Sequence, residues 1–115
     1  MSVEENKNVA RKYHDLNPDD TDKILTPEFI GRQVGTDTWT WNIRDHKRFL
    51  SEEGKGTKDT IHQQVAEGEW VATRFHRTMH YQGKVLELDM MHFKRFEGGK
   101  IAELWELTDQ KQFGA

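Results

Sequence analysis

The fold of this chain is decided by residues 70–109, WVATRFHRTMHYQGKVLELDMMHFKRFEGGKIAELWELTD. Branched and aromatic residues alternate with polar ones in residues 70–81, 84–96 and 101–109, which is the period of a β-strand. The pairs Gln82-Gly83 and Gly98-Gly99 between them are typical of tight turns. The stretch therefore predicts consecutive antiparallel strands joined by hairpins.

The strand pattern begins earlier, and the first half of the chain is helical. Ile61 and Val65 follow a two-residue period that ends at Glu67-Gly68, so we expect a further strand after Lys58. Residues 3–16 carry apolar side chains at helical spacing, with Tyr13 facing inward.

Two more helices are expected before the strands. Residues 20–26 predict a short helix with acidic residues in its first turn. Residues 32–41 predict a loop or an edge strand, after which Asn42 or Thr40 would cap a third helix that ends near Gly54.

Helices followed by hairpins indicate one α+β domain over residues 1–115, with the helices covering one face of a strongly curved antiparallel sheet. The chain has 17 basic and 20 acidic side chains and a net charge of -3, which argues against a dedicated nucleic-acid binder. It has no cysteine, which excludes disulfides and thiolate zinc sites.

The location expected from the sequence is the cytoplasm. The first residues, MSVEENKNVARKY, are charged where a signal peptide is apolar. No apolar run approaches the roughly 20 residues of a membrane span, so we expect no membrane partner.

The Gln82-Gly83 turn sets the pairing of the first hairpin. Tyr81 would pair with Lys84, which places Phe75 opposite Met90. This face of the hairpin is mostly apolar, whereas the other face carries exposed rings.

The second hairpin allows two registers. A two-residue Gly98-Gly99 loop would put Phe93 opposite Leu104, and a three-residue loop with a bulge would put His92 opposite Leu104. We favour the bulge, because it sets Glu106 diagonal to His92.

Two segments resemble a known family. Residues 69–75, EWVATRF, the turn at Gly83 and above all residues 92–106, HFKRFEGGKIAELWE, resemble the SnoaL-like polyketide cyclase branch of the nuclear transport factor 2-like superfamily. The resemblance covers nearly the whole chain. It implies a cone-shaped α+β barrel with a deep pocket, in a homodimer packed through the outer face of the sheet.

The resemblance also implies site residues. In the cyclases a carboxylate near the end of the last strand acts as acid and base, helped by a histidine on the preceding strand, and these positions match Glu106 and His92. In the similar ketosteroid isomerases a tyrosine on the first helix matches Tyr13. Their general base falls near residues 31–33, where this chain has no carboxylate, so ketosteroid isomerisation is not expected.

The ligand pocket is expected to combine the first helix, the connection before the third helix and the inner strand face: Tyr13, Trp41, Phe75, Arg77, Met79, Leu88, Met90, Leu104 and Thr108. Glu106 and His92 could form an acid/base pair or simply satisfy each other in a cavity. Arg77 could bind a ligand oxygen or pair with Glu106. Trp39 and Trp41 could wall the pocket or cover the open end of the cone.

The expected function is to bind a hydrophobic, carbonyl-bearing small molecule in this pocket. Glu106 would move a proton at the carbon next to the carbonyl, as in aldol-type cyclisation or isomerisation, and His92 would stabilise the oxygen. A non-catalytic ligand-binding or protein-interaction module of the same fold is the alternative. An epoxide hydrolase, with water activated by a carboxylate, is a third possibility.

No metal and no cofactor are expected. His76 and His80 share a strand face, but residues four apart on a strand are about 13 Å apart, too far to ligate one ion. The glycines form no phosphate-binding loop.

Overall fold

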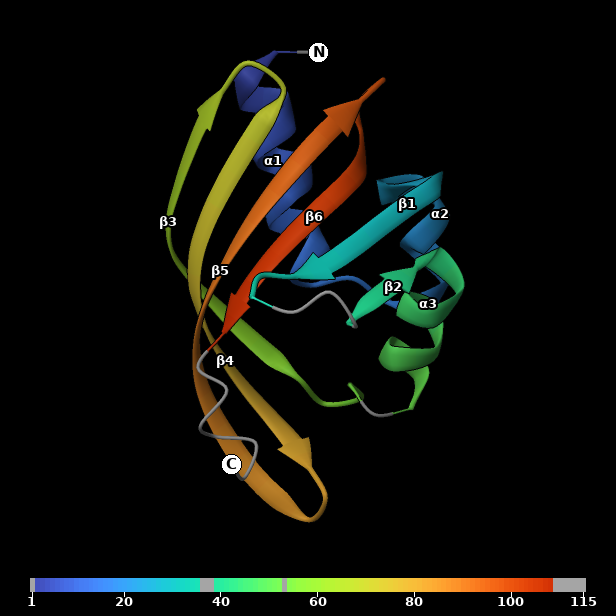
Figure 1. Cartoon of the computed structure of the whole chain (residues 1–115), viewed down its shortest axis with the longest axis vertical. Helices are drawn as coiled ribbons and strands as arrows, with labels where there is room; N and C mark the ends of the chain where they lie inside the picture. The colour runs from blue at the N-terminus through green and yellow to red at the C-terminus, as the bar shows by residue number, and fades with distance from the viewer. Residues whose placement is uncertain (1, 36–38, 53, 109–115) are drawn as a thin grey trace.

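Three helices and a six-stranded mixed sheet form the part of the chain that the computed structural model describes, residues 2–35, 39–52 and 54–108 (Figure 1). The elements are, in chain order, α1 (Val3–Tyr13), the 3₁₀ turn η1 (Pro18–Asp20), α2 (Thr21–Ile24), β1 (Leu25–Gln33), β2 (Thr40–Asn42), α3 (Ile43–Ser51), β3 (Lys58–Glu67), β4 (Trp70–Tyr81), β5 (Lys84–Glu97) and β6 (Lys100–Thr108). The predicted α+β class is confirmed.

The sheet is curved and open. Its order is β2-β1-β6-β5-β4-β3, so hydrogen bonds do not close it into a barrel. α1 lies across the hollow face and contacts β3, β4 and β6, while α3 packs beside β1 and β2 (Figure 1). The hollow face is thus covered at one end by α1 and at the other by α3.

Local sequence explains where the two longer helices begin. Ser2 and Glu5 form a capping box at the start of α1, and Asn42 and Asp45 form one at the start of α3. α1 ends at Tyr13, earlier than the predicted residue 16, because His14 leaves the helix to enter the domain interior.

The expected helix over residues 20–26 is wrong beyond Ile24. Residues 25–33 form β1, which pairs parallel with β6 and antiparallel with the short edge strand β2. Pro27 lies in the stretch between Leu25 and Ile30 where the register with β6 shifts, so its missing N–H breaks no regular ladder. Because β1 forms through pairing with β6, local propensity did not reveal it, and the sheet is mixed where an antiparallel one was expected.

The first hairpin has the predicted register, with Tyr81 opposite Lys84 and Phe75 opposite Met90. Gln82 has a φ of 50°, and Gly83 also has a positive φ, as a two-residue hairpin turn requires.

Both registers considered for the second hairpin are wrong. The loop is the two-residue Gly98-Gly99 turn, with Glu97 opposite Lys100, but β6 carries an extra residue, Ala102, between Ile101 and Glu103. This bulge shifts β6 in the direction opposite to the expected one, and it places Glu106 directly opposite His92.

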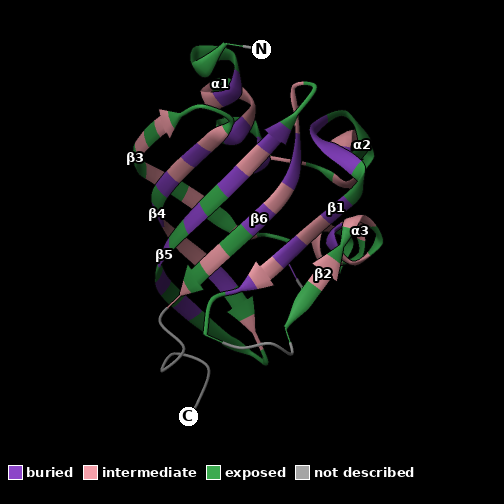
Figure 2. Ribbon diagram, turned by 45° about the horizontal axis from the view of Figure 1, so that its top comes forward, coloured by how far each residue is buried: buried purple, intermediate pink, exposed green. Residues whose placement is uncertain are grey.

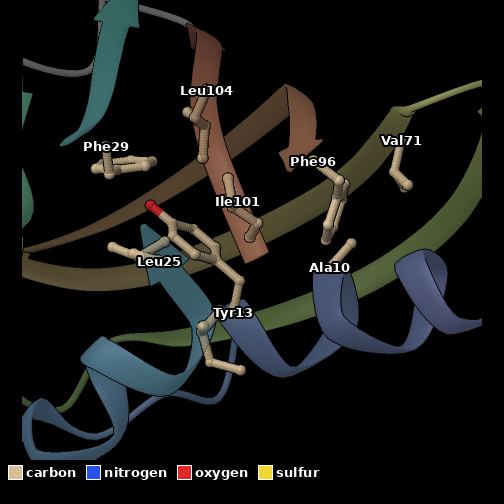
Figure 3. Packing of buried hydrophobic residues seen from close by; sticks show 9 residues of the cluster. Ala10, Tyr13, Leu25, Phe29, Val71, Phe96, Ile101 and Leu104 are labelled. Carbon is tan, nitrogen blue, oxygen red and sulfur yellow. The ribbon is translucent and has the colours of Figure 1, made fainter. Parts of the chain in front are cut away.

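Burial alternates along the strands, as the pattern of buried and exposed bands on β5 and β6 shows (Figure 2). The inner face carries two apolar clusters. The first joins α1, β1 and the sheet: Ala10, Tyr13, Ile24, Leu25, Phe29, Val71, Phe96, Ile101 and Leu104 (Figure 3). The second lies toward the β4–β5 turn: Phe75, Met79, Leu86, Leu88 and Met90.

No described helix is long and apolar enough to cross a membrane. The cytoplasmic location stays a prediction.

Candidate functional site

A pocket of about 380 Å³ opens between α1, α3, β2 and the inner face of the sheet. Aromatic rings and charged groups line it together: Tyr13, Trp39, Thr40, Trp41, Asp45, His46, Arg48, Phe49, Arg77 and Glu106. Its size and its mixture of rings with a few polar groups are typical of small-molecule sites.

Two of the aromatic walls rest on glycines. Gly31 of β1 is directly opposite Trp41 of β2, and a Cβ at Gly31 would overlap the indole. A Cβ at Gly54 would overlap the ring of Phe49 in the same way. The missing side chains let both rings lie against the backbone, which leaves the space of the pocket open.

Glu106 brings a carboxylate to the sheet side of the pocket. Its Oε1 lies 2.9 Å from Nε2 of His92, whose side chain is fully buried. Burial raises the pKa of Glu106, although nearby Arg77 opposes this. Burial, followed by the charge of Lys94, lowers the pKa of His92 well below its usual value. His92 is therefore neutral, and its Nε2–H donates to the Glu106 carboxylate.

Glu106 belongs to a row of polar residues that crosses five strands of the sheet. Gln64, Thr73, His92, Glu106 and Gln33 pair in register on β3, β4, β5, β6 and β1. Thr73 Oγ1 donates to Gln64 Oε1 at 3.0 Å, while Gln33 Nε2 is buried without a hydrogen-bond partner among the described residues. A polar row inside an apolar sheet face is costly unless its members are satisfied, which makes it unusual for a purely structural core.

Tyr13 and His46 form the wall opposite the sheet. Their rings stack with centroids 5.0 Å apart, and the hydroxyl of Tyr13 points away from α1 (Figure 3). The indole of Trp41 hydrogen-bonds to Tyr13, while burial and the nearby Glu106 raise the pKa of Tyr13, which keeps its hydroxyl protonated. Burial and Arg77 lower the pKa of His46 to about 4, so its ring is neutral.

Arg77 pairs with Asp59 instead of Glu106. Arg77 Nε donates to Asp59 Oδ1 at 2.8 Å, and Arg77 Nη2 donates to Oδ2 at 3.0 Å. Burial raises the pKa of Asp59, but the bonds from His14 and Arg77 outweigh this and lower it to about 2. Asp59 is therefore ionised, and it neutralises the guanidinium at the pocket wall.

Of the residues expected in the ligand pocket, Tyr13, Trp41 and Arg77 line it, as do the expected base Glu106 and the possible wall residue Trp39. Phe75, Met79, Leu88 and Met90 lie in the second apolar cluster, and Leu104 lies in the first. Thr108 is half-buried and outside the lining, and its Oγ1 is buried without a partner among the described residues. The expected site is thus divided between the pocket wall and the core behind it.

Sequence reasoning missed the contribution of α3, from which His46 and Phe49 reach the pocket. Their spacing of three residues places them on one helix face, a signal that could have suggested a shared role. For His14 and Asp59 the sequence offers no such signal, because they meet through tertiary contacts between α1 and β3.

Among the residues that the structure describes, no group of three or more His, Asp or Glu side chains is arranged to hold a metal ion. The side chains at the pocket thus offer hydrogen bonds, the carboxylates of Asp45 and Glu106 and the guanidinium groups of Arg48 and Arg77, which together can move a proton and hold an oxygen.

Comparisons with known proteins bear on the family. Among solved structures, a candidate SnoaL-like polyketide cyclase from Jannaschia sp. CCS1 has a TM-score of 0.80 and 13% identity, over 98% of this chain and 92% of that one. A candidate polyketide cyclase from Acidithiobacillus ferrooxidans has a TM-score of 0.76 and 18% identity, over 97% and 94% of the two chains. An LEH-like epoxide hydrolase from M. tuberculosis has a TM-score of 0.78 and 16% identity, over 96% and 86%.

At these identities the similarity shows the shared fold, and the fold alone serves several activities. A search of curated proteins found no match. The sequence profile of the SnoaL-like domain matches residues 9–104, which is most of the chain. This chain therefore belongs to the SnoaL-like domain family of the NTF2-like fold.

Proposed function

We propose that the pocket binds a flat, hydrophobic carbonyl compound and that Glu106 moves a proton at the carbon next to the carbonyl. The observation that carries this proposal is the Glu106 carboxyl at the pocket wall, held by the neutral His92 at 2.9 Å. Because burial raises its pKa, the Glu106 carboxylate is a stronger base than an exposed one. The aromatic walls favour a planar ligand.

In this reaction Glu106 takes the proton from carbon, and the electron pair of the C–H bond forms a double bond to the carbonyl carbon. The π electrons of the carbonyl move to its oxygen and give an enolate. In an aldol closure the enolate carbon attacks a second carbonyl, and the alkoxide that forms takes the proton from Glu106. In the isomerisation of an unsaturated ketone the negative charge extends over the C=C bond, and the far carbon of that bond takes the proton from Glu106. Atoms and charge balance without a cofactor.

The role of His92 changes from the one expected. Its side chain is fully buried and is not among the pocket-lining residues, so it cannot reach a ligand oxygen. We assign to His92 the orientation of Glu106. The Tyr13 hydroxyl and the Arg77 guanidinium line the pocket and can donate to the oxygen where charge develops.

Exchange of carbon-bound hydrogen tests the proposal. With 2-acetylnaphthalene in D₂O, the wild type should speed exchange of the methyl protons, followed by NMR, and Glu106→Gln should lose most of that acceleration while still binding the ketone. Glu28→Gln, at an exposed position of β1, is the matched control. Equal exchange by wild type and Glu106→Gln would contradict the base role.

The same experiment separates two other candidates. Binding without exchange in the wild type would favour the non-catalytic ligand-binding module. The position of Arg77 favours an epoxide hydrolase, because the nearby charges of Asp59 and Glu106 both raise the pKa of Arg77. Arg77 could then hold an epoxide oxygen while Glu106 activates water. Hydrolysis of styrene oxide by the wild type, lost in Glu106→Gln, would support that activity instead.

We also propose that two copies pair through the outer sheet face. Exposed apolar side chains gather there on β5 and β6: Met91, Phe93, Trp105 and Leu107. Phe93 and Trp105 help to line a shallow groove of about 560 Å³ together with Val34, Glu67 and Trp70. Apolar surface of this kind is rarely left in water.

A further inference from the structure

Arg77 lines the pocket and uses only one edge of its guanidinium in hydrogen bonds to the described residues. Residues Arg77 and Asp59 are directly opposite each other on β4 and β3, and the two hydrogen bonds between them use Nε and Nη2 of the arginine. Nη1 has no hydrogen-bond partner among the described residues, and Arg77 lines the pocket. A two-bond pair fixes the plane of the guanidinium, so the free edge is fixed too.

Asp59 also forms a hydrogen bond with His14. His14 Nδ1 lies 2.7 Å from Asp59 Oδ2, and the two side chains are only 2% and 3% exposed. Burial and the charge of Lys94 lower the pKa of His14 to about 4, so this ring is neutral and carries one proton. That proton lies on Nδ1, because an unprotonated nitrogen at 2.7 Å from a carboxylate oxygen would be repelled.

Lys94 is the last member of a hydrogen-bonded network that also contains Arg77, Asp59 and His14. Its side chain is 0% exposed, and its Nζ lies 2.9 Å from Nε2 of His14 and 3.4 Å from Oγ1 of Thr73. With the His14 proton on Nδ1, Nε2 is free to accept a hydrogen bond from Lys94. Burial lowers the pKa of Lys94 well below its usual value, and no described carboxylate lies within ion-pair distance of its Nζ.

A buried network of this kind costs more free energy than packing alone would justify. Taking the charges of Arg77 and Asp59 out of water costs several kcal/mol per charge, burying the polar amine of Lys94 adds to that cost, and apolar residues of similar volume often stabilise a core at least as well. Of the four residues, Arg77 is the one that lines the pocket. The three others therefore act on a ligand through Arg77 or not at all.

We propose that Asp59, His14 and Lys94 are positioning residues that fix Arg77 so that its Nη1 donates to the carbonyl oxygen of the bound ligand, an inference that rests on the proposed function. Arg77 would then be a catalytic residue beside Glu106. When the proton moves from carbon to Glu106, the negative charge moves to the ligand oxygen, and Arg77 stays close to the charge throughout.

The carbonyl of the bound ligand reports directly on this contact. In 2-acetylnaphthalene labelled with ¹³C at the carbonyl, a hydrogen bond from Arg77 should lower the stretching frequency and move the ¹³C resonance downfield. We expect Arg77→Met to abolish both shifts and to weaken binding about tenfold, the loss of one charge-assisted hydrogen bond. Asp59→Asn and Lys94→Met should reduce and broaden both shifts while the ketone still binds.

Glu103→Gln is the matched control. Glu103 accepts hydrogen bonds from Arg32 at 3.0 Å and from Arg95 at 3.4 Å on the opposite face of the sheet, so this variant also disturbs an arginine–carboxylate pair but not the pocket. Its bound ketone should show the wild-type carbonyl shift. A carbonyl shift in Asp59→Asn and Lys94→Met equal to that of the wild type would overturn the inference and leave the proposed function standing.

A second measurement needs no ligand. Rotation about the Cζ–N bonds of Arg77 should be slow in the wild type, so that its Nη resonances are separate in ¹⁵N NMR spectra, and faster in Asp59→Asn and Lys94→Met. If the ketone does not bind, the proposed function fails, and these spectra still decide whether Asp59, His14 and Lys94 position Arg77. Unchanged rotation in both variants would refute that positioning.

Discussion

His92 on β5 and Glu106 on β6 are directly opposite each other, with Nε2 and Oε1 2.9 Å apart. This pairing depends on a single extra residue, Ala102, because without that bulge β6 would be displaced by one position and Glu106 would turn to the other face. The bulge therefore decides whether the Glu106 carboxylate lies in the pocket.

Replacing Glu106 by Gln should stabilise the protein at high pH. The folded pKa of Glu106 is raised, so its contribution to stability is largest below the unfolded value of 4.5 and is lost as the pH rises through the folded pKa. Gln keeps a carbonyl oxygen for the His92 Nε2–H without a buried charge. Urea unfolding should show a gain of about 1 kcal/mol at pH 8 and little change at pH 4. A loss of stability at pH 8 would contradict this account.

Acid should unfold the protein through its buried histidines. The pKa values of His14 and His46 are lowered to about 4, so the unfolded chain binds protons that the folded chain does not between pH 6.5 and 4. The contribution of these two histidines to stability is complete above pH 6.5 and falls on acidification, by at most about 3 kcal/mol for each histidine. His46→Phe, which keeps the ring that stacks on Tyr13, should reduce the pH slope of the unfolding free energy by about one proton. An unchanged slope would show that His46 is already protonated in the folded state.

Gly31→Ala should narrow the pocket. The added methyl group overlaps the indole of Trp41, which must move off β1 and away from Tyr13. We expect a cost of about 1–3 kcal/mol in thermal unfolding, which is typical of overpacking, and weaker binding of 2-acetylnaphthalene than of the smaller acetophenone. The double variant Gly31→Ala with Trp41→Leu should recover much of the stability, because the smaller side chain makes room. Additive effects of the two changes would mean that the methyl group and the indole do not meet.

A charge in the exposed apolar patch should separate the proposed dimer. Phe93 is 51% exposed and belongs to the apolar patch formed with Met91, Trp105 and Leu107, so Phe93→Lys would have to bury an ammonium group between two copies. Light scattering should give the dimer mass for the wild type and the monomer mass for Phe93→Lys. Val85→Lys is the control, because Val85 is also exposed but lies next to the β4–β5 turn. A wild type that is monomeric at every concentration would remove the dimer proposal.

Short-range patterns determined much of this protein. The two-residue period of residues 70–109 predicted the strands β4, β5 and β6, and Gln82-Gly83 predicted the register of the first hairpin. Because side chains alternate along a strand, the same period put His92 on the inner face, whereas Glu106 reached that face only through the bulge expected in the second hairpin, whose register was wrong. These features follow from contacts between residues close in sequence, where backbone propensity and turn geometry decide.

Only the tertiary structure decided the rest. β1 is a strand because it pairs with β6. The local sequence did not predict this strand, because Pro27 interrupts its pattern. Arg77 pairs with Asp59 and not Glu106, and Asp59 is joined by His14 from a distance of 45 residues along the chain. Such contacts depend on how α1 and α3 pack over a curved sheet and on one bulge in β6. Their physical reason is that folding buries residues that are far apart in the sequence next to one another, and each buried charged group then pairs with the oppositely charged or polar group that lies within hydrogen-bond distance.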